Sequence, residues 1–116
     1  MAEPRMVSYA VSCLTAATHN LYTCPPNCRS KVSLVFFANA NGNNTVSLSW
    51  YRKVDDDSYY VIGGKNMSVG EYVQLSQAYI VLEPEDRLDI TLTDAGHIDA
   101  LCTAEELFTA NTTRAG

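Results

Sequence analysis

Apolar and polar side chains alternate along several segments of this chain, and that alternation most restricts how it can fold. In residues 86–94, the apolar members are Leu88, Ile90 and Leu92. A strand places residues two apart on one face, whereas a helix would scatter these three around its circumference. Residues 45–52 repeat the alternation with Val46, Leu48 and Trp50. Both segments are therefore predicted to be strands that bury one face.

Residues 31–40 begin with the same alternation and then become apolar at consecutive positions. One expected face carries Val32, Leu34 and Phe36, and the other carries Val35 and Phe37. Apolar residues on both faces are typical of a strand that is covered on both sides. We therefore expect this strand to be central in its sheet.

Turn residues separate the strand candidates. Asn41-Gly42 is the strongest short signal for a hairpin, because both residues tolerate positive φ, so residues 31–40 and 45–52 are expected to pair antiparallel. Residues 55–58 predict a turn into a strand at 59–62, which Gly63-Gly64 is expected to end. Weaker strand candidates are residues 6–11, 20–24, 72–75, 79–82 and 98–103.

About eight short strands predict an all-β domain, a single antiparallel β-sandwich of jelly-roll or immunoglobulin-like type. Residues 1–108 are expected to form the sandwich, and the small, polar residues 109–116 a mobile tail. For residues 103–108, a short helical turn with Thr103 and Glu106 as its capping box and a continued strand are both open. Cys28, Trp50 and Cys102 follow the immunoglobulin order, but Ala100 replaces the tyrosine expected two residues before the last cysteine.

Charge and hydropathy exclude two classes of partner. Eight basic against 13 acidic residues give a net charge of −5, and the basic residues form no stripe along which phosphates could bind. The apolar stretches are far shorter than the roughly 20 residues that span a bilayer. We therefore expect neither nucleic-acid binding nor membrane insertion. The first residues lack the pattern of a signal peptide, so synthesis in the cytoplasm is expected.

The four cysteines allow metal binding, disulfide formation or simple burial. Cys24 and Cys28 flank a proline turn, but a zinc site needs a second pair of ligands at close spacing, and Cys13 and Cys102 are far apart in sequence. Free thiols are the default in a protein made in the cytosol. The alternative is a disulfide or crosslink that involves Cys24 or Cys28, which the proline turn is expected to expose. No metal or cofactor is expected.

Residues for catalysis are few. His19 and His97 are the only histidines, and motifs for a nucleophile or a phosphate loop are absent. Asp94 and Asp99 flank His97 in sequence, as expected for a solvated loop. The run Asp55-Asp56-Asp57 lacks the ligand spacing of a calcium loop. The chain is therefore not expected to be an enzyme.

Tyrosine is the most informative residue type, with seven copies. Tyr51, Tyr59 and Tyr60 fall around one expected hairpin, and Tyr72 lies on a later strand candidate. Tyrosine buries a large area at low entropic cost and keeps a polar tip, which favours it at interfaces. These four are candidate interface residues. Packing between strands of the same molecule is the alternative.

Two stretches carry a resemblance. They are NLYTCPPNCRSKVSLVFFAN at residues 20–39 and VLEPEDRLDITLTDAGHIDA at residues 81–100. With the central strand at 46–51, they resemble small β-sandwich virion proteins of tailed bacteriophages over residues 19–108. Cys24 and Cys28 depart from that pattern, in which apolar or small residues flank the turn. The departure leaves open an added crosslinking role.

The resemblance implies a non-enzymatic virion structural protein that decorates the capsid or belongs to the neck, collar or tail. Its partners would be other virion proteins and further copies of itself, in a homo-oligomer. It would be found in the virion after synthesis in the host cytoplasm. The alternative is a carbohydrate- or receptor-binding module, in which Tyr59, Tyr60 and the acidic hairpin contact a host-surface glycan. A hydrolase centred on His97 is a third hypothesis.

Overall fold

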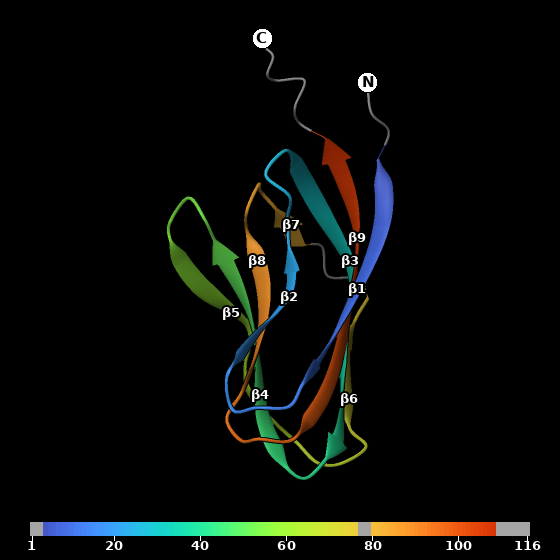
Figure 1. Cartoon of the computed structure of the whole chain (residues 1–116), viewed down its shortest axis with the longest axis vertical. Helices are drawn as coiled ribbons and strands as arrows, with labels where there is room; N and C mark the ends of the chain where they lie inside the picture. Colours follow the sequence, from blue (N-terminus) through green and yellow to red (C-terminus); the bar gives the residue numbers. More distant parts are fainter. Residues whose placement is uncertain (1–3, 77–79, 109–116) are drawn as a thin grey trace.

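Two antiparallel sheets pack face to face in the structure, a computed structural model that describes residues 4–76 and 80–108 (Figure 1). These residues form nine strands: β1 (Arg5–Cys13), β2 (Thr18–Thr23), β3 (Cys28–Asn41), β4 (Asn44–Arg52), β5 (Asp57–Met67), β6 (Tyr72–Leu75), β7 (Ile80–Leu82), β8 (Arg87–Leu92) and β9 (His97–Phe108). The first sheet has the order β1-β9-β3-β6, with β7 also on β3, and the second has the order β2-β8-β4-β5. The predicted all-β sandwich is confirmed.

The strand pairings are nested in the sequence. β4 pairs with β5, β3 with β6, β2 with β8 and β1 with β9. The chain therefore resembles one long hairpin that has been rolled so that successive pairs alternate between the sheets. This is the arrangement of a jelly roll. In the part of the chain that the structure describes, no helix is long and apolar enough to cross a bilayer.

The alternating segments bury the face that the sequence predicts. The exposed fractions of Val46, Leu48, Leu88 and Ile90 are all 0%. Trp50 lies at the end of this row and is half-buried. Burial of a large apolar side chain contributes about 1.5–3 kcal/mol, so this shared face favours packing of the two sheets.

β3 is central, as expected, because β9 pairs with one side and β6 and β7 with the other. The predicted face is wrong beyond Val32. A β-bulge between Val32 and Leu34 adds a residue and shifts the alternation, so that Val35 and Phe37 point inward. Leu34 and Phe36 are consequently half-buried on the outer face of the sheet.

The predicted hairpin at Asn41-Gly42 is wrong, because β3 and β4 belong to different sheets. Two buried asparagines direct the chain across the gap. The Asn39 amide donates to the carbonyl oxygens of Gly42 and, at 3.0 Å, Met67. The Asn44 carboxamide oxygen accepts from the backbone N–H of Thr45 at 2.9 Å and of Asp94 at 3.1 Å. These bonds replace the ladder that a hairpin would have supplied.

Gly63-Gly64 does not end its strand, since β5 continues to Met67. The glycines lie between the register pairs Leu48–Ile62 and Val46–Lys65, where the pairing shifts. Gly64 has a φ of 67° and its N–H donates to the Ser47 hydroxyl at 2.9 Å. Glycine adopts positive φ without strain, so the pair forms a bulge and not a stop.

At the other end of the chain, the strand alternative is confirmed and the helical turn is wrong, because β9 runs to Phe108. Thr103 faces outward and Glu106 inward, in the alternation of a strand. The strand expected at 79–82 is β7, and residue 79 lies outside the described residues. Residues 109–116 also lie outside them, so the mobile tail stays a prediction.

We expect Asn44→Ala to lower the free energy of unfolding by about 2–3 kcal/mol, because it leaves two backbone N–H groups at a buried corner without their acceptor. Asn43→Ala is the matched control, since Asn43 is exposed in the same turn. Urea unfolding of both variants measures the difference. Equal losses in the two variants would show that Asn44 does not hold the corner.

Candidate interaction surfaces

The β4–β5 hairpin carries three of the four candidate interface tyrosines. Tyr51 comes from β4, and Tyr59 and Tyr60 come from the start of β5. Tyr60 is 75% exposed and Tyr59 is 45% exposed, whereas Tyr51 is half-buried. Register pairs Trp50 with Tyr59 and Ser49 with Tyr60, so the two β5 tyrosines lie on opposite faces of the hairpin.

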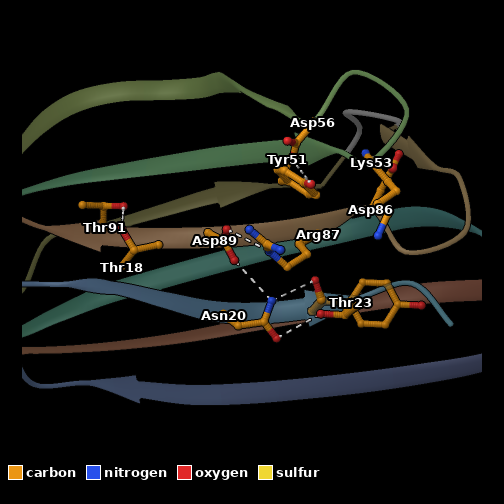
Figure 2. Close-up of polar contacts among 11 residues, drawn as sticks. Thr18, Asn20, Thr23, Tyr51, Lys53, Asp56, Asp86, Arg87, Asp89 and Thr91 are labelled. Carbon is orange, nitrogen blue, oxygen red and sulfur yellow. Dashed lines mark hydrogen bonds and ion pairs between the residues drawn. The ribbon is translucent and has the colours of Figure 1, made fainter. Parts of the chain in front are cut away.

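Tyr51 is fixed within a polar network on the outer face of the second sheet (Figure 2). Its hydroxyl donates to the Asp56 carboxylate, and the Arg87 guanidinium lies 4.1 Å from its ring centroid. The bond to Asp56 raises the pKa of the Tyr51 phenol. Arg87 also pairs with Asp89 at 3.3 Å, and Asn20 donates to Asp89 at 3.2 Å. The network therefore links β2, β8 and β4 into one rigid polar face.

Tyr59 is held on the other side of the hairpin. Its hydroxyl donates to Asp55 at 2.9 Å, which raises the pKa of the Tyr59 phenol. Arg52 pairs with the same Asp55 oxygen at 3.0 Å and lies over the Trp50 ring, 5.6 Å from its centroid. Asp55 in the acidic turn therefore holds the Tyr59 ring directly and the Arg52 side chain over the Trp50 ring.

Asp86 anchors this hairpin to the body of the sandwich, a role that the sequence analysis missed. It lies between the turn at residues 84–85 and β8, yet it is only 1% exposed. Its carboxylate accepts from the Trp50 indole N–H at 3.2 Å and from the backbone N–H groups of Lys53 at 2.9 Å and Glu83 at 3.0 Å. Nothing in the local sequence distinguishes Asp86 from the neighbouring Glu83 and Glu85.

Tyr72 lies apart from the other three, on the outer face of the first sheet. It is 62% exposed and its ring centroid is 5.5 Å from that of Phe36. Phe36 also borders a shallow depression of about 340 Å³, which is lined by Ala10, Val11, Ser12, Phe36, Asp99, Ala100 and Leu101. The candidate tyrosines therefore define two surfaces on opposite sheets.

The expected exposure of Cys24 and Cys28 is wrong, because both are 0% exposed. Cys28 begins β3 with its side chain inward, and the Cys24 thiol donates to the Cys28 carbonyl at 3.2 Å. All four cysteines are free and buried. Burial raises the pKa of the Cys24 thiol to about 11 and that of Cys102 to about 12. Crosslinking through Cys24 or Cys28 stays a prediction that now requires the proline turn to open.

A second unforeseen feature is a buried carboxylate next to this turn. Glu106 is 0% exposed and accepts from the Tyr22 hydroxyl at 2.6 Å and from Arg5 Nε at 2.8 Å. Tyr22 also bonds to Ser30 at 2.6 Å. Burial, and next the bond to Glu106, raise the pKa of Tyr22. The signal was present in the sequence, since Glu106 is in phase with Cys102 and the other inward residues of β9.

His97 is not arranged for hydrolysis. Its Nε2 lies 2.9 Å from Asp99 Oδ1, and the same Asp99 oxygen accepts from the Ser12 hydroxyl at 2.6 Å. These two bonds lower the pKa of Asp99. A catalytic triad needs histidine between the hydroxyl and the acid, whereas here the acid lies between the other two. Across residues 4–76 and 80–108, no group of three potential metal ligands is found.

No protein-family model matches the chain, and no curated protein matches it. Solved structures of similar fold include VP2 of infectious bursal disease virus in T=1 particles, with a TM-score of 0.56, 13% identity and coverage of 95% of this chain and 33% of that chain. The acid-stable capsid structure of Helicobacter pylori bacteriophage KHP30 has a TM-score of 0.54 and 13% identity, and the match covers 90% of this chain and 94% of that one.

The chain thus spans about a third of the bursal disease virus chain and nearly all of the KHP30 chain that it matches. At these identities, the likeness is one of fold. The class defined by fold and surface is a single jelly-roll domain with exposed aromatic side chains on both sheets.

We expect Glu106→Ala to destabilise the protein by about 3 kcal/mol, because it leaves the buried Tyr22 hydroxyl without its acceptor. Glu105→Ala is the matched control on the outward face of β9 and should cost less than about 1 kcal/mol. Thermal unfolding of both variants compares them. A loss in Glu105→Ala as large as in Glu106→Ala would contradict the role of the buried network.

The four thiols should react slowly with a disulfide reagent at pH 8 in the native protein, because they are buried and burial raises the pKa of Cys24 to about 11. All four should react at once in denaturant. Labelling followed by mass spectrometry assigns each site. Immediate native labelling of Cys24 or Cys28 would show that the proline turn opens readily.

Proposed function

We propose that this chain is a non-enzymatic structural component of a bacteriophage particle, which binds other virion proteins as a decoration, neck, collar or tail subunit. The observation that carries the proposal is the exposure of large aromatic side chains on both sheets of a rigid sandwich, with Tyr60 at 75% and Tyr72 at 62%. Exposed aromatic residues are enriched where protein surfaces meet. Two separate surfaces suit a protein that joins neighbours in an assembly.

The fold comparison supports the same proposal. The KHP30 capsid structure contains a chain of nearly the same length and a similar fold. A domain of this size and fold therefore occurs in a phage capsid. The resemblance of residues 20–39 and 81–100 to virion proteins points the same way. The protein would then be made in the host cytoplasm, assemble with copies of itself and remain in the virion.

Localisation on the particle tests this function. Antibody labelling of assembled particles in electron micrographs should place the protein at one repeated position, and the purified protein should co-sediment with virion components. Tyr60→Ala should weaken that binding by about tenfold or more if the hairpin is the contact, whereas Tyr72→Ala tests the opposite sheet. Absence of the protein from purified particles would refute the function.

A second function, carbohydrate or receptor binding, is favoured by one feature of the hairpin. Tyr59 and Tyr60 border a shallow pocket of about 160 Å³ that is also lined by Ser49 and Ser58. An aromatic ring beside hydroxyl groups suits the apolar and polar faces of a sugar.

A glycan array separates the two functions. Glycan binding that disappears in a Tyr59→Ala, Tyr60→Ala double variant would favour the sugar-binding module. A wild-type protein that binds no glycan on the array would leave the structural function as the better account. Tyr72→Ala is the control, since it removes an exposed tyrosine from the other sheet.

A further inference from the structure

The outer strands of the two sheets differ in how their free edges are protected. β2 is short and carries a bulge at Asn20–Tyr22. β5 is long, but its register shifts twice, and one shift contains Gly63-Gly64. β6 and β7 have only four and three residues. Short strands and bulges are the devices that prevent an edge from pairing with another chain.

β1 has none of these devices. Its nine residues pair with nine consecutive residues of β9 without a register shift. Its sequence from Met6 to Cys13 contains no proline, glycine or charged residue. The single charge, on Arg5, is engaged by Glu106. Among the described residues, β1 pairs with β9 alone, so it presents a long, regular edge along one side of the sandwich (Figure 1).

Exposed apolar side chains accompany this open edge. Met6, on the outer face, is 61% exposed. Tyr9, on the inward face, is 46% exposed, and its ring centroid is 5.2 Å from that of the buried Tyr22. An edge with unpaired backbone groups and apolar side chains on both faces favours the addition of another strand.

We propose that β1 pairs with β1 of a second copy of this chain, antiparallel across a two-fold axis. The other edges of the sandwich are protected, so the open edge that a second copy can offer is again β1. A contact between identical surfaces is isologous and generates a closed dimer. The role of this dimer in a particle rests on the proposed function. The inference names the surface through which copies of the chain associate.

The alternation of β1 restricts the geometry of this pairing. An antiparallel two-fold axis perpendicular to the sheet places residues of the same face opposite one another, so one residue of β1 faces its own copy. With Ser8 on the axis, Met6 lies opposite Ala10, and with Tyr9 on the axis, Met6 lies opposite Ser12.

In both registers, the long Met6 side chain therefore meets a small residue that lines the depression beside Phe36 and Leu101. Methionine adapts its shape to such irregular surfaces. The two Arg5 side chains lie at opposite ends of the contact, so like charges do not face each other. The sheet that contains β1 in one copy would join the same sheet of the other copy, so that one continuous sheet crosses the dimer.

The sharpest test compares two variants. One places a charge on the edge strand β1, and the other places the same charge on β9, one strand away from the edge. Ser8 and Thr103 share a hydrogen bond of 2.9 Å between β1 and β9, and both are on the outer face. Ser8→Lys and Thr103→Lys each remove that bond and add one charge. Strands are about 4.8 Å apart. With Ser8 on the axis, the two residues at position 8 are therefore about one strand spacing apart, and with Tyr9 on the axis they are diagonal neighbours about 8 Å apart. The two residues at position 103 are about three strand spacings apart or more in both registers.

Sedimentation over a wide range of protein concentration should show a monomer–dimer equilibrium for the wild type. Ser8→Lys should weaken the dimer by more than about tenfold at physiological salt, because in both registers it brings two like charges close together across the axis. Thr103→Lys should change it by less than about threefold, because its charges lie beyond the screening length of about 8 Å. Circular dichroism and thermal unfolding confirm that each variant is folded.

A second pair of variants tests the apolar contact. Met6→Ala should weaken the dimer, whereas Val81→Ala, which truncates a 46% exposed residue on β7 of the same sheet, should leave it unchanged. A wild-type monomer at every concentration would overturn the proposal, as would a dimer that survives both Met6→Ala and Ser8→Lys. Loss of particle binding with the dimer intact would overturn the proposed function alone.

Discussion

The chain must cross between the two sheets without leaving buried backbone groups unpaired, and the rest of the structure depends on how it meets this constraint. Asn39 and Asn44 satisfy the backbone where β3 leads into β4. Asp86 satisfies it at the opposite end of β4. Each is at most 4% exposed. Because a buried unpaired amide costs about 1–3 kcal/mol, these short polar side chains determine where the strands change sheet.

Glu106 acts between the sheets in a similar way but carries a charge. It lies on β9 and accepts from Tyr22 on β2 and from Arg5 on β1. Burial of a carboxylate is costly unless hydrogen bonds and an opposite charge compensate it. The two bonds supply that compensation and hold the first residue of β1 against β9. The pairing of β1 with β9 that begins at Arg5 then continues without a register shift to Cys13.

The sequence predicted the class of fold because alternation reports burial directly, as at Leu88 and Ile90. It did not predict which strands pair. Asn41-Gly42 has the local chemistry of a hairpin, but the buried neighbours Asn39 and Asn44 carry the chain into the other sheet. Bulges, as in β3, shift the phase without a signal of their own.

The sequence singles out candidate tyrosines because Tyr51, Tyr59 and Tyr60 cluster around one hairpin, and their role at an interface stays a prediction. Two buried acidic residues that hold the strands together, Glu106 and Asp86, were not predicted. Glu106 could have been recognised from its phase within β9, since every second residue there points inward. Asp86 could not, because its partners Trp50 and Lys53 are distant in sequence and come close only after the sheets pack. The exposure of Cys24 and Cys28 was misjudged because a proline turn says nothing about the inward direction of the strand that follows.

The position of the open edge relative to the tyrosine hairpin would connect the proposed self-association with partner binding. β1 lies beside β2, while β5 is at the other end of the order β2-β8-β4-β5, on the far side of the molecule (Figure 1). Pairing through β1 would therefore leave both hairpins, with Tyr59 and Tyr60, at the outer ends of a dimer. Two linked copies of a weak contact bind an array far more tightly than one, because the second contact forms at a high effective concentration. In such a dimer, an edge that would be a hazard in a lone sandwich would allow a modest tyrosine surface to hold a repeating lattice.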